Sequence, residues 1–119
     1  MDPVMLVTGG SRGIGAATSL MAAKYGYAVA VNYRSNREAA DRVVAAIEKD
    51  GGRAIAVAAD MAVEDDVVAL FETVDAELGP VTCLVNNAGI VDDPCPVAEM
   101  SAERISRMMA VNVVGPFIA

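Results

Sequence analysis

Four short apolar runs along the chain are each typical of a buried β-strand. They occupy residues 4–8, 28–33, 53–59 and 81–86. Longer segments with apolar residues at helical spacing follow or separate them. Because strands and helices alternate at this rhythm, the pattern predicts a parallel sheet with helices on both faces.

Each helical segment carries signals for its ends and for its buried face. The first covers residues 14–25 and stops at Gly26, and the second is predicted to begin at a capping box, residues 35–38. The acids at residues 64–66 open the third helix, where they suit the helix dipole, and Ser101 is predicted to cap a fourth. The expected core faces are Ile14, Ala17, Leu20 and Met21; Ala40, Val43, Val44 and Ile47; Val67, Leu70, Phe71, Val74 and Leu78; and Ile105, Met108 and Met109.

Right-handed crossovers between parallel strands favour the strand order 3-2-1-4. The expected architecture is a Rossmann-type, doubly wound α/β fold that is incomplete at four strands. In open sheets of this kind, ligands bind beyond the carboxyl ends of the strands. Those ends are therefore where a functional site is expected.

A glycine-rich turn, residues 8–15, follows the first run and leads into the first helix. Backbone N–H groups of such a turn and a helix N-terminus form an anion site, and glycines let a pyrophosphate come close. A P-loop is excluded because Gly15 is followed by two alanines, and G-x-G-x-x-G fails because Gly13 and Gly15 lead to Thr18. The spacing present is Thr-Gly-x-x-x-Gly-x-Gly. A tight turn without a ligand is the plainer alternative.

The end of the second run favours a phosphorylated dinucleotide, NADP(H). Proteins that bind NAD place an acid about 20 residues past the glycines, where it holds the ribose 2′-hydroxyl. Here the stretch reads Asn32-Tyr33-Arg34-Ser35. The guanidinium groups of Arg34 and Arg12 can hold a 2′-phosphate instead, and Ser35 can add a hydroxyl. A solvated surface arginine is the alternative for Arg34.

Taken in order, these motifs resemble the short-chain dehydrogenase/reductase family. Asp60 matches the family carboxylate that binds the adenine amino group, residues 86–89 match its motif beside the cofactor ribose, and Asn112 falls at its catalytic-relay asparagine. The resemblance covers essentially all 119 residues. Within the family, the sequence is most similar in character to 3-oxoacyl-carrier-protein reductases and glucose 1-dehydrogenases. It implies cofactor contacts by Gly9, Ser11, Arg12, Gly13, Ile14, Gly15, Arg34, Ser35, Asp60, Met61, Asn87, Ala88 and Gly89.

Plainer roles stay open for several of these residues. Asp60 can cap the helix that follows it, and Asn86 is expected to satisfy backbone groups at the strand end. Asn112 can be an ordinary exposed residue, since a buried amide needs partners. Pro116 argues for the relay, because it lacks the N–H that a continuous helix directs to the carbonyl of residue 112, and Gly115 eases the resulting kink. The resemblance implies that this carbonyl holds a water leading to the catalytic lysine.

Composition and charge narrow the function classes. Hydrophobic residues make up 55% of the chain, enough for a core, and the net charge of −7 argues against nucleic acid as a partner. No apolar run approaches the roughly 20 residues of a membrane helix, and the N-terminus lacks the features of a secretion signal, so a cytoplasmic protein is expected. The chain has no His. Cys83 and Cys95 are therefore expected to be reduced cysteines rather than a redox or metal pair.

The Tyr-x-x-x-Lys motif that this family uses in catalysis does not occur in the sequence. The resemblance implies a catalytic serine after a fifth strand and a Tyr-x-x-x-Lys helix beyond it, whose tyrosine protonates the substrate oxygen. None of Tyr25, Tyr27 and Tyr33 has a lysine four residues later. Residues 1–119 are therefore expected to be the NADP(H)-binding, N-terminal half of a longer single-domain oxidoreductase that acts on a small carbonyl or alcohol substrate and forms homo-oligomers. A non-catalytic NADP(H)-binding module is the alternative.

Overall fold

The computed structural model describes residues 2–89 and 97–119. In chain order its elements are β1 (Val4–Val7), α1 (Gly13–Lys24), β2 (Ala28–Tyr33), α2 (Arg37–Lys49), β3 (Ala54–Ala58), α3 (Glu64–Glu77), β4 (Cys83–Val85), η1 (Val97–Glu99), α4 (Ala102–Met109), η2 (Ala110–Val114) and α5 (Gly115–Ile118). The four predicted strands and the helices between them are all present. Cys83 carries a free thiol, and Cys95 lies outside the described residues.

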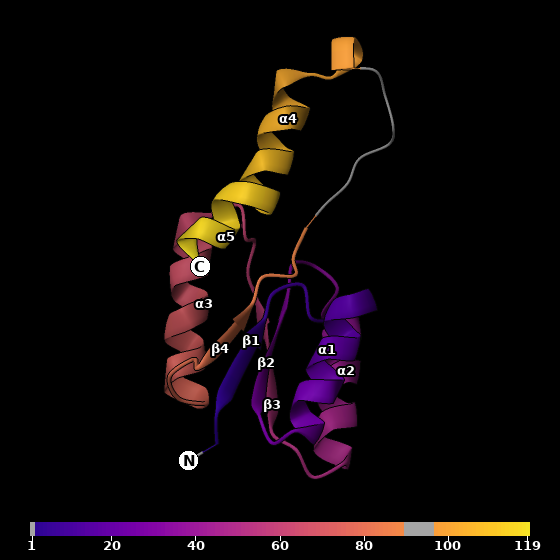
Figure 1. Ribbon diagram of the computed structural model, residues 1–119, viewed down its shortest axis with the longest axis vertical. Coiled ribbons are helices and arrows are strands. Elements are labelled where there is room, and N and C mark those ends of the chain that lie inside the picture. Colours follow the sequence, from indigo (N-terminus) through magenta and orange to yellow (C-terminus); the bar gives the residue numbers. More distant parts are fainter. Residues whose placement is uncertain (1, 90–96) are drawn as a thin grey trace.

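Within these residues four strands form one parallel sheet in the order β3-β2-β1-β4, which confirms the predicted order. Figure 1 shows α1 and α2 on one face of the sheet and α3 on the other. At the end of β1, Val7 is paired with Val31 of β2 and with Val85 of β4. The glycine turn therefore leaves the sheet between two neighbouring strands.

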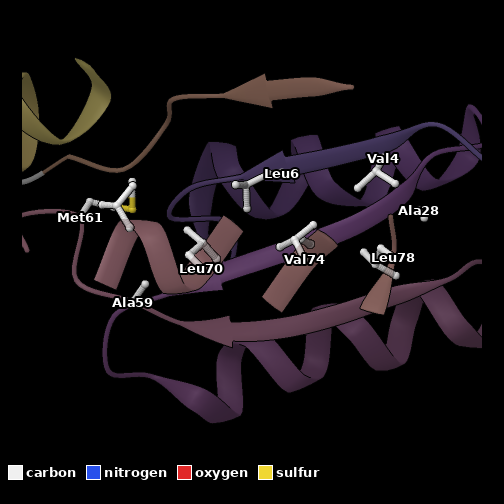
Figure 2. Packing of buried hydrophobic residues seen from close by; sticks show 10 residues of the cluster. Val4, Leu6, Ala28, Ala59, Met61, Leu70, Val74 and Leu78 are labelled. Carbon is white, nitrogen blue, oxygen red and sulfur yellow. The ribbon is translucent and has the colours of Figure 1, made fainter. Parts of the chain in front are cut away.

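Both faces of the sheet are covered, and β2 is buried along its whole length. Ala28 and Ala30 pack into the core on the α3 side, whereas Val29 and Val31 pack against α1 and α2. Successive side chains of a strand point to opposite faces, so a strand that is covered on both sides reads as a continuous apolar run. The core on the α3 side contains Val4, Leu6, Ala28, Ala59, Met61, Leu70, Val74 and Leu78 (Figure 2).

The predicted core face of the first helix is wrong. α1 buries Gly15, Ser19 and Ala22, and the four residues of the predicted stripe are exposed, with Ile14 at 79%. The reason is the close approach of α1 to the glycine turn. A Cβ at Gly15 would collide with the Gly9 carbonyl oxygen, and the buried Ser19 hydroxyl donates to the Gly15 carbonyl at 2.9 Å. Small residues therefore form the contact, and the large apolar ones point away from it.

The start of α2 also differs from the prediction. Its N-cap is Asn36, whose side-chain oxygen accepts a hydrogen bond from the Ala39 N–H at 3.0 Å. The predicted capping box placed the cap one residue earlier, at Ser35. Both residue types are strong N-caps, and the helix begins one residue later than the box requires.

The other predicted core faces divide into two groups. In α2 and α3 they are correct, because their members are buried apart from Val44 and Phe71, which are half-buried. In α4, capped by Ser101 as predicted, the face is not a core, since Ile105 and Met109 are exposed and the helix contains no buried residue. Figure 1 shows α4 extending beyond the body of the molecule.

The chain passes from α4 into α5 through a π-helical turn, η2. The Gly115 N–H donates to the carbonyl of Ala110, five residues back, instead of four. Such a turn widens the helix locally, and it ends two residues before Pro116. Gly115 also lies against the loop after β3, where a Cβ would collide with the Met61 carbonyl oxygen.

The N-cap of α2 gives a test of this fold. We expect Asn36→Ala to lower the free energy of unfolding by about 1 kcal/mol, because the Ala39 N–H loses its partner. Ser35→Ala is the matched control and should change stability by less than about 0.5 kcal/mol. Urea denaturation of both variants measures the difference. If Ser35→Ala lowered the free energy of unfolding more than Asn36→Ala does, the N-cap would be Ser35, as the capping box predicted.

Candidate functional site

A pocket of about 450 Å³ opens beyond the carboxyl ends of the strands. Its walls come from the glycine turn, from the segments that follow β2, β3 and β4, and from η2. It is lined by Gly9, Ser11, Arg12, Gly13, Asn32, Tyr33, Arg34, Ser35, Asn36, Ala59, Asp60, Met61, Asn87, Ala88, Gly89 and Val111.

The glycine turn is held from both sides at Gly9. Its N–H donates to the side-chain oxygen of Asn32 at 3.1 Å, and its carbonyl accepts from the side-chain amide of Asn87 at 3.0 Å. The next residue, Gly10, donates to the Asn32 backbone carbonyl at 2.9 Å. The φ of Gly9 is 61°, a conformation that favours glycine. The shape of the turn is therefore set by Asn32 in β2 and by Asn87 after β4 together.

Thr8 connects the turn to the segment after β4. Its hydroxyl oxygen accepts from the backbone N–H groups of Asn87 and Ala88, each at 3.0 Å. The hydroxyl itself donates to the carbonyl of Val85 at 3.3 Å. One buried threonine thus holds the start of the Asn-Ala-Gly segment against the pocket.

Asn32 is a site residue that was not predicted. Its side chain is 2% exposed, and beside its bond to Gly9 its amide nitrogen lies within 3.3 Å of the carbonyls of Val57 and Ala59 in and after β3. The side chain therefore joins the glycine turn to the end of β3. A signal was present in the sequence, because Asn32 is a lone polar residue inside an apolar run.

The N-terminus of α1 suits an anion better than the N-termini of α2 and α3. In the part of the chain that the structure describes, no side-chain hydrogen bond caps α1 and no acid lies in its first turn. By contrast, Asn36 caps α2, and three acids occupy the first turn of α3. A helix N-terminus carries unpaired N–H groups and a partial positive charge. The α1 terminus beside the pocket is thus a candidate phosphate site.

Arg34 and Asp60 meet across the pocket wall. Arg34 Nε lies 3.5 Å from Asp60 Oδ2, with side-chain exposures of 58% and 28%. The other carboxylate oxygen of Asp60 accepts from the Ala62 N–H at 2.9 Å. Asp60 does not cap α3, whose N-cap is Val63, so that alternative is wrong. The carboxylate instead closes the loop that precedes the helix.

A family model described as short chain dehydrogenase matches residues 3–119 of this chain. The chain belongs to the short-chain dehydrogenase family. The family resemblance and the Rossmann-type fold predicted from the motifs are confirmed.

Similar proteins are about twice as long as this short-chain dehydrogenase chain. The uncharacterized oxidoreductase YgfF of Escherichia coli (strain K12) is 49% identical over 115 residues, which are 97% of this chain and 47% of YgfF. A 3-oxoacyl-[acyl-carrier-protein] reductase of Synechocystis sp. is 44% identical over 115 residues, 97% of this chain and 46% of that protein. The structure of angucycline C-6 ketoreductase LanV with bound NADP matches with a TM-score of 0.88 and 43% identity, over 97% of this chain and 47% of LanV. The chain thus spans about half the length of these relatives.

The pocket of the short-chain dehydrogenase chain gathers all of the predicted cofactor residues except Ile14 and Gly15. Gly15 is buried under the turn against Gly9, and the Ile14 side chain is exposed outside the pocket lining. The lining also includes residues that were not predicted, namely Asn32, Tyr33, Asn36, Ala59 and Val111.

The two remaining predicted asparagines, Asn86 and Asn112, do not line the pocket. Asn112 is exposed, and its side-chain oxygen is 3.3 Å from the point that a Cβ on Gly89 would occupy. The Asn86 side-chain amide donates to the Pro116 carbonyl at 3.4 Å. Asn86 therefore satisfies a backbone group, although this group lies in α5 and not at the strand end as predicted, and Asn112 lies next to the predicted cofactor segment.

Two further observations concern metal ions and membranes. Residues 2–89 and 97–119 contain no group of three or more His, Cys, Asp or Glu side chains that could hold a metal ion. Among the helices described, none has the length and apolar character needed to cross a membrane.

Replacement of Asn32 tests whether this side chain holds the site together. We expect Asn32→Leu to lower the free energy of unfolding by about 2–4 kcal/mol, because buried backbone groups of the turn and of β3 lose their partners. Asn86→Ala, which removes one long and exposed hydrogen bond, should cost less than about 0.5 kcal/mol. Chemical denaturation of both variants gives the comparison. Equal losses would mean that Asn32 is not a special support of the turn.

Proposed function

We propose that this chain is the NADP(H)-binding part of an oxidoreductase that transfers hydride between the nicotinamide and a small carbonyl or alcohol substrate. Family membership supports the oxidoreductase class. The choice of NADP(H) over NAD(H) is supported by one feature of the pocket, its two arginines, Arg12 in the glycine turn and Arg34 after β2.

Arg34 and Arg12 both line the pocket, and the segment that follows β2 contains no acid. An acid at that point would accept from a ribose 2′-hydroxyl and repel a 2′-phosphate. A guanidinium is planar and offers several N–H donors in a geometry that matches phosphate oxygens. LanV, which is similar to this chain over nearly its whole length, was solved with NADP. This similarity supports the same cofactor here.

Each part of the pocket has a role under this proposal. The glycine turn and the α1 N-terminus would bind the pyrophosphate through backbone N–H groups, and Asp60 would accept from the adenine amino group. Residues 87–89 would lie along the ribose next to the nicotinamide, with Asn112 beside Gly89 as a relay residue. When bound, NADP(H) supplies or accepts the hydride. The residues of this chain hold and orient it.

The exposed apolar side chains of α4 support a second part of the proposal, self-association. Ile105 and Met109 are exposed, and no residue of the helix is buried. Apolar groups on a helix that projects from the body gain most from a protein partner that covers them. We propose that a second copy of the protein does so.

A non-catalytic NADP(H)-binding module is the second candidate function. Residues 1–119 contain no tyrosine followed four residues later by a lysine. Both candidates require the same cofactor pocket. They differ in whether the natural protein reduces a carbonyl substrate with NADPH.

The cofactor preference can be tested at Arg34. We expect the wild type to bind NADPH more tightly than NADH, and Arg34→Asp to remove about 1.5–3 kcal/mol of that preference, because charge-assisted contacts to the phosphate are lost. Arg37→Asp makes the same change of charge outside the pocket lining and should keep the preference. Calorimetric titration with both cofactors measures it. A wild type that prefers NADH, or an Arg34→Asp variant with unchanged preference, would contradict NADP(H) binding.

A chain of residues 1–119 should bind the cofactor without catalysing the reaction. We expect the 119-residue chain to bind NADPH but to reduce no carbonyl substrate, because it has no Tyr-x-x-x-Lys to protonate the substrate oxygen. A family member that carries this motif, assayed with the same carbonyl compounds, is the positive control. Steady NADPH oxidation by a chain whose mass has been verified would show that catalysis does not need the motif.

A further inference from the structure

The ion pair between Arg34 and Asp60 joins two residues that the proposed function uses separately. Asp60 follows β3 and is proposed to accept from the adenine amino group, whereas Arg34 follows β2 and is proposed to hold the 2′-phosphate. Their contact, at 3.5 Å, runs between Asp60 Oδ2 and Arg34 Nε. Since β2 and β3 are paired up to Tyr33 and Ala58, the two side chains start from neighbouring positions at the same edge of the sheet.

The carboxylate is the fixed member of this pair. Asp60 Oδ1 accepts from the Ala62 N–H at 2.9 Å, and the Asp60 backbone N–H donates to Asp66 at 2.8 Å. The Asp60 carbonyl accepts from the Val63 N–H at 3.0 Å. The loop is therefore tied at both the side chain and the backbone. Arg34, by contrast, has a long side chain that is more than half exposed and has many rotamers to lose on binding.

We propose that Asp60 is a positioning residue that orients the Arg34 guanidinium and thereby sets the preference for NADP(H) over NAD(H). This inference rests on the proposed function. A contact at Nε still leaves N–H donors on the two terminal nitrogens, because a guanidinium has five in a fixed fork. An arginine that is held at Nε presents this fork to a phosphate with less loss of side-chain freedom on binding.

An opposing effect has to be weighed, since the carboxylate also repels a phosphate. The pair lies at an open pocket wall, where water and salt weaken the interaction between separated charges. The guanidinium lies in direct contact with the carboxylate and would also contact the phosphate. Orientation therefore outweighs repulsion, and loss of the carboxylate should weaken the binding of the phosphorylated cofactor.

Asp60→Asn tests the inference in the full chain. The variant keeps an oxygen for the Ala62 N–H but removes the negative charge that holds Arg34. We expect the ratio of NADH to NADPH dissociation constants to fall by about 1.5-fold to fivefold, the range of an exposed ion pair. Any adenine contact of Asp60 is common to both cofactors and cancels in this ratio. Calorimetric titration measures both constants, and retained NADH binding shows that the variant is folded.

The chain contains a matched control, the pair formed by Arg37 and Asp41. Arg37 Nε lies 3.6 Å from Asp41 Oδ2, and neither residue lines the pocket. Asp41→Asn removes the same charge from the same kind of contact. The ratio of NADH to NADPH dissociation constants in this variant should equal that of the wild type. If Asp41→Asn lowers the ratio as much as Asp60→Asn does, the effect is one of net charge and the inference is overturned.

A double-mutant cycle separates this inference from the proposed function. In an Arg34→Ala background, Asp60→Asn should leave the ratio unchanged, because the carboxylate acts through the arginine. The positioning role alone is overturned if the ratio in the single Asp60→Asn variant is unchanged or higher. It is also overturned if Asp60→Asn lowers the ratio equally with and without Arg34. A ratio that does not respond to Arg34→Ala overturns the proposed NADP(H) function and this inference together. If Asp60→Asn does not fold, Asp60→Ser, which also offers an oxygen to the Ala62 N–H, replaces it with the same expectations.

Discussion

The close packing around Gly9 determines how the glycine turn, α1 and the segment after β4 fit together. The Gly9 N–H is held by Asn32 and its carbonyl by Asn87, and a Cβ on it would lie 3.0 Å from the Ala88 Cα. Gly15 of α1 passes so close to the Gly9 carbonyl that no side chain fits there. The direction of α1 follows from this contact. So does the direction of the N–H groups at its start, which border the pocket.

Charge in this chain is distributed so that an acidic protein can still offer a site for an anion. The net charge is −7, yet Arg12 and Arg34 line the pocket and the first turn of α1 contains no acid. Charges act strongly only within about 8–10 Å at cellular ionic strength, so the local groups decide. Asp60 is the acid of the pocket lining, and it is paired with Arg34. The pocket thus combines an acid suited to an amino group with arginines suited to a phosphate.

Much of this fold was predictable from the sequence because its strands are buried on both faces and its crossovers are right-handed. The predicted buried face of α1 was wrong. The backbone of this helix comes so close to the glycine turn that only small residues fit between them, whereas the prediction relied on the spacing of the large apolar residues. The helix start at Asn36 rather than Ser35 was not decidable from the types of the two residues. Asn32 was missed because its partners are 23 and 25 residues away along the chain. Only the paired strands bring them together.

An amide at position 32 is chemically suited to its place in a way that other side chains of its size are not. It must accept from the Gly9 N–H and donate toward carbonyls at the end of β3, and an amide has both an acceptor and donors. A carboxylate cannot donate, and a leucine can do neither. Arg34 lies two residues beyond this amide, and Asp60 lies one residue beyond Ala59, whose carbonyl the amide contacts. The asparagine that holds the glycine turn therefore also joins the strand ends that carry the Arg34–Asp60 pair.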